Sequence, residues 1–381
     1  MTQSFSTAPV FFETLSTQSG YQIGVAWLNQ PQALNGLSLE MAQALQAQLN
    51  AWEADPLVAV VVLRGSGEKA FCAGGDLQTI YSGLPAVPTH DGWANDYLKT
   101  FFRVEYALDH HIHCYSKPVL CWANGIVMGG GAGLMMGASH RVGTSSTRFA
   151  MPETTIGMFP DVGGTWLLNR MPAGVGRFLA MTGTSIGVAD AYALGVINYV
   201  LPDTAWPELL NRLGTASWGQ NRMQNDAVIH TCLEALGLGA PDPGPVICHA
   251  PEMARWCAGP DWYQVYQTLT GLQGSDDVWL SQAVQRLKKA CPATVALSFE
   301  MLKRGRHLSL AQIFQMEYTV ALNTTARGDF REGIRALLIE KTGNPKWSPA
   351  DADQVNTPLV DAFFVPPWPD DEPHPLAVLG Y

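Results

Sequence analysis

The stretch VAVVVL, residues 58–63, places the strongest constraint on the fold of this chain. A continuous run of apolar, mostly β-branched residues predicts a strand that is covered on both faces, as in a parallel sheet. The segment YQIGVAWL, residues 21–28, predicts a second strand, and residues 37–53 between the two have the apolar spacing of a helix. This β-α-β alternation predicts an α/β architecture.

Further strands are predicted at 118–123 and around 140, and helical patterns dominate after residue 164. Residues 216–290 are polar and irregular and predict no clear element. Two amphipathic helices are predicted from residue 292 onward. We therefore expect three regions: a core at 1–205, a helical C-terminal region at 206–350 packed on that core, and a Pro-rich tail at 351–381.

Charge and cysteine usage exclude several classes of protein. The 381 residues carry a net charge of −10, which argues against binding to nucleic acid or to an anionic membrane. Seven scattered cysteines without a CxxC pair suit reduced thiols, and the N-terminus lacks the pattern of a secretory signal, so we expect a cytoplasmic location. Residues 118–139 carry no charge, but Asn124 and six glycines favour a strand, a turn and a buried helix over a membrane span.

The segment MPETTIGMFPDVGG, residues 151–164, carries two carboxylates in apolar, turn-rich surroundings. A carboxylate in an apolar pocket is costly to ionise, which suits it to proton transfer or nucleophilic attack. The structural alternative is that Glu153 begins a helix after Pro152 and that Asp161 caps the helix that follows. Taken singly, each acid fits the structural alternative better.

Two glycine-rich segments are candidates for ligand binding. In KAFCAGGDL, residues 69–77, the glycines allow a sharp turn, and Asp76 stands where a helix N-cap is expected. In GIVMGGGAGLMMG, residues 125–137, three consecutive glycines open a helix whose free N–H groups could stabilise an oxyanion. Close packing of small residues is the alternative for this run, which matches neither the dinucleotide fingerprint nor a P-loop.

Two further motifs have a structural interpretation. DHHIH, residues 109–113, lacks the spacing of a metal site and is interpreted as a solvated helix end, so no metal ligand is predicted. GTSIG, residues 183–187, matches the pattern of a nucleophile elbow, but a helical stretch precedes it where that motif needs a strand.

The ordered set of KAFCAGGDL, GIVMGGGAGL and FAMPETTIGMFPDVGG resembles the crotonase (enoyl-CoA hydratase/isomerase) superfamily. Within it the chain looks most like the 3-hydroxyisobutyryl-CoA hydrolases, on the further segments FFRVEYAL (101–108) and GDFREGIRALLIEKTGNPKWSP. The resemblance covers about 20–205 and 290–350. It implies a spiral of ββα units with a helical C-terminal region, and an acyl-CoA ligand bound between the two glycine segments.

The resemblance also implies roles for individual residues. The catalytic pair falls on Glu153, as nucleophile or general base, and on Asp161, which would orient the substrate hydroxyl or the water. The oxyanion N–H groups fall on Gly75 and Gly130. The implied substrate contacts are Glu105, Ala73, Asp76 and Leu77.

These roles imply hydrolysis of a short 3-hydroxyacyl-CoA, with 3-hydroxyisobutyryl-CoA in valine breakdown as the expected substrate. A hydratase of this superfamily carries a glutamate at the position where this chain has Gly133. That difference disfavours an enoyl-CoA hydratase or isomerase, which is therefore the second interpretation. A non-catalytic acyl-CoA-binding protein is the third. No cofactor is implied beyond the coenzyme A of the substrate, and the implied partners are that substrate and possible copies of this chain in a homo-oligomer. Members of the resembled family often carry basic residues near the CoA phosphates where this chain has Gln30 and Gln32, which leaves Lys69 as the candidate there.

Overall fold

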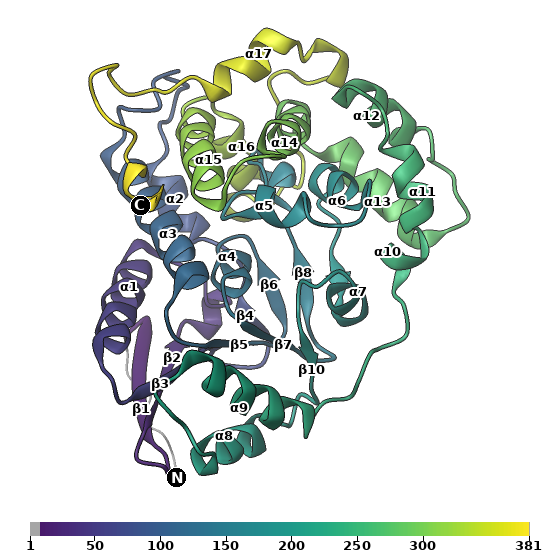
Figure 1. Ribbon diagram of the computed structural model, residues 1–381. Coiled ribbons are helices and arrows are strands. Elements are labelled where there is room, and N and C mark those ends of the chain that lie inside the picture. The colour runs from purple at the N-terminus through teal and green to yellow at the C-terminus, as the bar shows by residue number, and fades with distance from the viewer. Residues whose placement is uncertain (1–7, 381) are drawn as a thin grey trace. The chain divides into compact units, whose positions relative to one another are not determined.

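The computed structural model describes residues 8–380 (Figure 1). The prediction that the N-terminus carries no secretory signal falls partly on residues 1–7, outside this range. The chain divides into two compact units that alternate along the sequence. Unit 1 contains residues up to 75, 111–149 and 186–244, and unit 2 contains 76–110, 150–185 and the residues from 245 onward. The units therefore do not follow the expected boundaries at 205 and 350.

A six-stranded sheet forms the centre of unit 1, in the order β1-β2-β3-β5-β7-β10. β1 and β2 are antiparallel, and the other neighbours are parallel, so the predicted α/β fold is confirmed. The strands are Val10–Ser16 (β1), Gln22–Leu28 (β2), Val58–Gly65 (β3), Val119–Ala123 (β5), His140–Gly143 (β7) and Tyr199–Val200 (β10). The VAVVVL run is fully buried within β3, as its composition predicts.

Three helices of unit 1 have recognisable sequence causes. Helix α1 (Leu39–Ala54) begins at Ser38, whose side chain accepts a hydrogen bond from the N–H of Met41. Helices α8 (Trp206–Thr215) and α9 (Arg222–Glu234) share a hydrophobic core with strands β2, β3 and β5. The prediction of irregular structure from 216 is therefore wrong. The sequence of α9 mixes polar and apolar residues without a clear apolar stripe, and only a few buried side chains, such as Ile229 and Leu233, attach it to the sheet.

A smaller sheet of unit 1 has the strand order β4-β6-β8-β9. Its strands are Ala70–Cys72 (β4), Ile126–Met128 (β6), Arg148–Ala150 (β8) and Ile186–Gly187 (β9), and helices α4 (Gly130–Met136) and α7 (Val188–Ala193) accompany it. The uncharged segment 118–139 thus forms the predicted strand (β5) and helix (α4), with a short strand, β6, between them that was not predicted. Among residues 8–380, no helix has the length and apolar character needed to cross a membrane.

Unit 2 is almost entirely helical, which confirms the predicted helical C-terminal region. Its first helices are α2 (Leu77–Gly83), α3 (Asp96–Cys114), the 3₁₀ helix η2 (Glu153–Ile156), α5 (Gly164–Leu168) and α6 (Val175–Thr182). Only the part of α3 up to His110 belongs to unit 2. The later ones are α10 (Pro245–Cys248), α11 (Ala250–Trp256), α12 (Trp262–Thr270), α13 (Val278–Lys289), α14 (Pro292–Gly305), α15 (Leu310–Thr325), α16 (Asp329–Ile334) and α17 (Thr357–Asp361). The Pro-rich end of the chain is attached to α15, because Asn323 Nδ2 donates to the carbonyl oxygens of Phe363 and Val365, at 2.8 Å each.

Candidate active site

The two acids of the segment 151–164 both lie in buried positions of unit 2. Glu153 is the first residue of η2, which ends at Gly157 with a φ of +75°. Asp161 lies in the turn before α5, and its side chain does not cap that helix: the N-cap is Gly163, without a side-chain hydrogen bond. Of the two structural roles considered from the sequence, the start of a helix at Glu153 is therefore confirmed, and the capping of the next helix by Asp161 is wrong.

Five buried carboxyl groups of unit 2 influence one another electrostatically. They are Glu105, Asp109, Glu153, Asp161 and Glu317, and none is more than 7% exposed. Burial raises the pKa of Asp161 to about 6 and that of Glu317 to about 8. Burial, followed by the charge of a neighbouring acid, raises the pKa values of Glu105, Asp109 and Glu153 well above their usual range. Carboxyls with raised pKa values exchange protons near neutral pH, which general acid–base catalysis requires.

Glu153 and Asp161 differ in their hydrogen bonds. The hydroxyl group of Tyr106 donates to Asp161 Oδ2 at 2.7 Å, and this bond favours the ionised form of Asp161. The Oε2 atom of Glu153 is buried and has no hydrogen-bond partner within residues 8–380. An unsatisfied buried carboxyl oxygen is costly, and such groups concentrate at functional sites. Glu153 thus has an oxygen available to react, whereas Asp161 is held by a donor.

Helix α3 contributes two acids to this cluster, Glu105 and Asp109, and also carries Tyr106; the sequence did not reveal the role of Asp109 or Tyr106. Glu105, the predicted substrate contact, is 2% exposed and lies one turn from Asp109. The prediction that DHHIH is a solvated helix end is wrong for Asp109, which is fully buried with neither carboxyl oxygen hydrogen-bonded among the described residues. The spacing of four between Glu105 and Asp109 was a usable signal. Tyr106 and Glu317 carried no local signal of their role.

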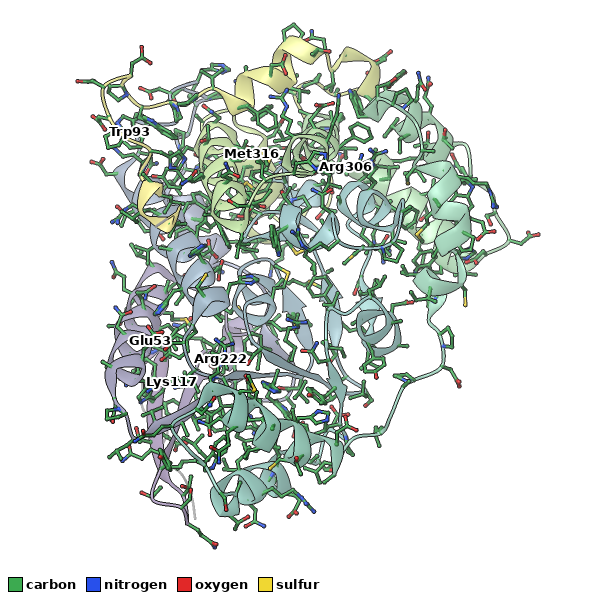
Figure 2. The ribbon with its side chains drawn as sticks, in the orientation of Figure 1. Glu53, Trp93, Lys117, Arg222, Arg306 and Met316 are labelled. Atoms are coloured by element: carbon green, nitrogen blue, oxygen red, sulfur yellow. The ribbon has the colours of Figure 1, made fainter. Side chains whose placement is uncertain are left out.

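His111, one of the two histidines of this motif that lie in unit 1, has ordinary side-chain partners. His111 Nδ1 is 2.6 Å from Gln46 Nε2, and its Nε2 is 2.9 Å from Glu53 Oε2, both on α1. Glu53 is labelled in Figure 2. Its carboxylate also accepts the N–H of Ser116 at 2.9 Å. These contacts give His111 a structural role.

The two glycine segments come together within unit 1. A Cβ atom at Gly74, whose φ is +114°, would lie 3.5 Å from Met128 O and 3.9 Å from Gly129 Cα. Helix α4 packs directly on β4, because a Cβ at Gly131 would lie only 2.2 Å from Cys72 O. α4 begins at Gly130, as the glycine triplet predicts. Within residues 8–380 the N–H groups of Gly75 and Gly130 have no protein acceptor, so both are available to a ligand.

The remaining predicted substrate contacts surround the first glycine turn. Asp76 caps α2 by accepting the N–H groups of Gln78 and Thr79, at 3.2 Å each, as the capping alternative predicts. Leu77 is the first residue of α2. Ala73, on unit 1, donates its N–H to Leu34 O at 3.0 Å. These three residues are partly exposed, and their contacts with a substrate stay a prediction.

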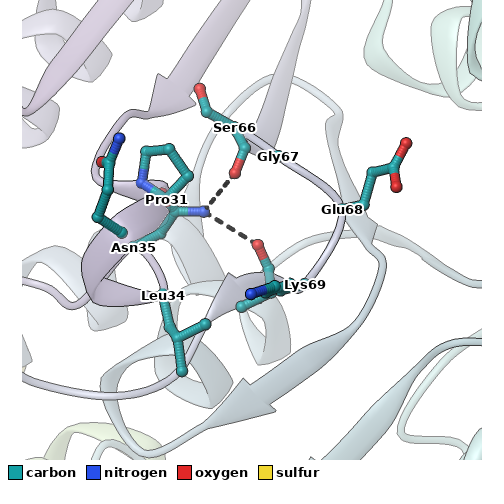
Figure 3. Close-up of a pocket in the computed structure, with 9 residues that line it drawn as sticks. Pro31, Leu34, Asn35, Ser66, Gly67, Glu68 and Lys69 are labelled. Atoms are coloured by element: carbon teal, nitrogen blue, oxygen red, sulfur yellow. Dashed lines mark hydrogen bonds between the residues drawn. The ribbon is translucent and has the colours of Figure 1, made fainter.

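A pocket of about 360 Å³ opens in unit 1, lined in part by Lys69 and Ala70 at the start of the first glycine segment (Figure 3). Its floor is fixed by Asn35, whose Nδ2 donates to Ser66 O at 3.0 Å and to Ala70 O at 2.9 Å. Gln32 and Lys69 line it, together with Pro31. The residue predicted to meet CoA phosphates therefore borders a pocket that could accept part of a ligand.

The motif GTSIG does not form a nucleophile elbow. Helix α6 precedes it, and Ile186 and Gly187 form the short strand β9. A nucleophile elbow needs the opposite order, a strand followed by a helix. The prediction from sequence is confirmed.

Comparison with known proteins places these features in context. A model of the enoyl-CoA hydratase/isomerase family matches residues 23–364. A protein of Xenopus tropicalis named "3-hydroxyisobutyryl-CoA hydrolase, mitochondrial" is 34% identical over 354 residues, 92% of this chain and 88% of the relative. A protein of Dictyostelium discoideum with the same name is 33% identical over 95% of this chain and 93% of its own length.

Two solved structures match nearly the whole chain. A carnitinyl-CoA dehydratase from Mycobacterium thermoresistibile has a TM-score of 0.82 and 30% identity, covering 95% of this chain and 97% of its own. An enoyl-CoA hydratase from Rhodobacter sphaeroides has a TM-score of 0.79 and 30% identity, covering 94% and 98%. The similarity confirms the predicted architecture with a helical C-terminal region.

The expected cytoplasmic location is contradicted by these comparisons. The curated relatives are named as mitochondrial proteins, among them those of Xenopus tropicalis, Danio rerio and Homo sapiens. The expectation rested on reduced cysteines and on the lack of a secretory signal pattern, and none of the seven cysteines, all within the described residues, forms a disulfide. Reduced thiols do not separate the cytosol from other reducing compartments, so that argument was insufficient.

Proposed function

Because the chain belongs to the enoyl-CoA hydratase/isomerase family, we propose that it hydrolyses a short-chain 3-hydroxyacyl-CoA thioester, with 3-hydroxyisobutyryl-CoA of valine breakdown as its substrate. The products are 3-hydroxyisobutyrate and free CoA. The observation that carries this assignment is the buried pair of Glu153 and Asp161, combined with Gly133 at the position of the second hydratase glutamate. The names of the curated relatives support the same substrate.

In this reaction Glu153 acts on the thioester carbonyl carbon. It either attacks that carbon, forming an anhydride that water then hydrolyses, or removes a proton from the attacking water. In both cases the C–S bond breaks, the carbon gains an oxygen from water, and the CoA sulfur leaves and takes up a proton. Burial keeps the pKa of Glu153 high, so its ionised form is a stronger base than an exposed glutamate. Asp161, ionised with the help of Tyr106, orients the 3-hydroxyl group or the water.

We assign stabilisation of the carbonyl oxygen to the N–H groups of Gly75 and Gly130. Neither donates to a protein acceptor among residues 8–380, and the dipole of α4 adds positive potential at Gly130. One oxyanion donor is typically worth about 3 kcal/mol of transition-state stabilisation. The pocket bordered by Gln32 and Lys69 is assigned to the CoA part of the substrate, with Lys69 as its cation.

The assignment is tested by product analysis. Purified protein incubated with 3-hydroxyisobutyryl-CoA should yield the free acid and CoA in equal amounts by mass spectrometry. Consumption of crotonyl-CoA with loss of the enoyl absorbance and without free CoA would favour the hydratase interpretation. Binding of both thioesters without turnover would favour an acyl-CoA-binding protein. The implied homo-oligomer stays a prediction that light scattering would check.

Replacing Tyr106 with Phe should move the acid limb of the pH–rate profile to higher pH. The pKa of Asp161 is about 6, so activity that needs its ionised form falls as the pH drops through 6. Burial raises the pKa of Asp161, and the Tyr106 hydroxyl opposes this effect by stabilising the ionised form, so its removal should raise the pKa further. The measurement is kcat/KM between pH 5 and 9 for both proteins. An acid limb at the same pH in Tyr106→Phe and wild type would contradict this role.

A further inference from the structure

The loop that carries Asp161 has an unfavourable backbone conformation. Val162 has a φ of +51°, in the left-handed region that a β-branched residue rarely occupies, and Gly163 follows with a φ of +82°. Helix α5 begins directly after it without a side-chain cap from its own N-terminal residues. A strained turn at a functional residue persists only where the surroundings hold it.

Glu317 supplies contacts that hold this turn. Its Oε2 accepts the N–H of Gly163 at 2.8 Å, and its Oε1 accepts the N–H of Thr165 at 3.1 Å. The side chain is fully buried and comes from α15, about 150 residues further along the chain. It thus satisfies the open N–H groups at the start of α5, which the sequence around α5 leaves without a partner. Met316, labelled in Figure 2, is its neighbour on α15.

A second residue of α15 supports the same turn. Phe314 lies one turn before Glu317, and a Cβ atom at Gly163 would lie 3.2 Å from its ring. The ring of Phe314 also packs against Tyr106, with 5.9 Å between the ring centroids. Because Tyr106 donates to Asp161, α15 fixes both the backbone of the turn and the donor to its carboxylate.

From these contacts we infer that Glu317 is a positioning residue for the reaction: it holds the turn 161–165 so that the Asp161 carboxylate meets Tyr106 and the substrate. The inference rests on the proposed hydrolase function for its kinetic consequence. The alternative is a purely structural helix cap, whose loss would lower stability without affecting Asp161. The two differ in whether the effect of Glu317 depends on the presence of Asp161.

The kinetic test is a double-mutant cycle of Glu317→Gln and Asp161→Asn, assayed by thiol release. The amide of Gln can accept only one of the two N–H groups, since its nitrogen is a donor. Glu317→Gln alone should lower kcat by about 10- to 100-fold through displacement of Asp161, with a much smaller change in KM. In the Asp161→Asn background the same change should lower kcat by less than about twofold. Equal effects in both backgrounds would overturn the inference.

The matched control is Asn323→Ala. Asn323 is buried on the same helix and also binds backbone groups, but those of Phe363 and Val365 in the C-terminal segment. It should lower stability while leaving kcat within about twofold, because it does not contact the 161–165 turn. A kcat loss in Asn323→Ala as large as in Glu317→Gln would show a general effect of destabilising α15 and would contradict the positioning role.

Hydrogen exchange measures the contact without relying on activity. In Glu317→Gln the amides of Gly163 and Thr165 should exchange about tenfold faster or more, while those of α14 stay protected. Unchanged protection of Gly163 and Thr165 would overturn the inference, as would faster exchange with an unchanged kcat.

If the wild type releases no thiol, the hydrolase assignment fails, and the exchange result alone decides whether Glu317 holds the turn. If Glu317→Gln does not fold, Glu317→Asp, which keeps the carboxyl group but shortens its reach, replaces it in both experiments.

Discussion

The Glu153→Gln variant is expected to lose thioester hydrolysis, with kcat reduced by about 10³- to 10⁴-fold. The amide has nearly the same shape, yet it can neither attack the carbonyl carbon nor take a proton from water. The Oε2 atom of Glu153 has no hydrogen-bond partner in the described residues, so the exchange of O for NH₂ breaks no protein contact of that atom. Folding and substrate binding should therefore be retained. The measurements are the rate of thiol release and the Kd for the substrate by calorimetry.

Asp329→Asn is the matched control for this variant. Asp329 is another buried acid of unit 2, and burial raises its pKa to about 6. Its contacts are the N–H of Ser348 and the thiol of Cys291, outside the catalytic cluster. Asp329→Asn should change stability and leave kcat within about threefold. A Glu153→Gln variant that is as active as Asp329→Asn would show that Glu153 is not the reacting carboxyl.

The Gly131→Ala variant is expected to damage both stability and catalysis. The added methyl carbon would lie 2.2 Å from Cys72 O and 2.7 Å from Cys72 Cβ, so α4 must move away from β4. Such overpacking typically costs about 1–3 kcal/mol, and more where backbone atoms have to shift. The movement also displaces the N–H of Gly130, and a misplacement of about 1 Å can reduce kcat by about 100-fold. Urea denaturation and thiol release measure the two effects.

Gly214→Ala provides the comparison within the same unit. Gly214 lies in α8, and nothing is within 4 Å of the position of its added Cβ. Alanine has the higher helix propensity, so this variant should gain about 0.5–1 kcal/mol of stability and keep its activity. If Gly131→Ala behaved like Gly214→Ala, the tight contact between α4 and β4 would have no role in placing the Gly130 N–H.

The elements that could be predicted from the sequence are those whose own local pattern specifies one conformation. The β-branched run of β3 and the glycine triplet before α4 each specify one conformation, and both predictions are confirmed. Within segment 216–290, helix α13 buries Leu280, Ala283, Val284 and Leu287 at helical spacing, a signal that the prediction missed. Helices α9, α10 and α11 were not predictable, because they are attached by few apolar side chains. In such segments tertiary packing, rather than periodicity, decides the structure.

The candidate site was predictable only where a motif carried it. Glu153, Asp161 and Glu105 stand in recognisable segments, and all three are found in the buried acidic cluster. Asp109 was missed because adjacent histidines made its segment look solvated. Glu317 was missed because its partners, Gly163 and Thr165, lie about 150 residues earlier in the chain. Long-range hydrogen bonds of this kind leave no periodic signal in a single sequence.

The most direct measurement is the progress curve of free thiol released from 3-hydroxyisobutyryl-CoA by the purified wild-type protein. The same sample is followed with crotonyl-CoA at the enoyl absorbance. The predicted result is rapid, stoichiometric thiol release from the hydroxyacyl thioester and no loss of crotonyl-CoA absorbance. Loss of that absorbance without any thiol release would contradict the assignment and show that Gly133 does not prevent hydration.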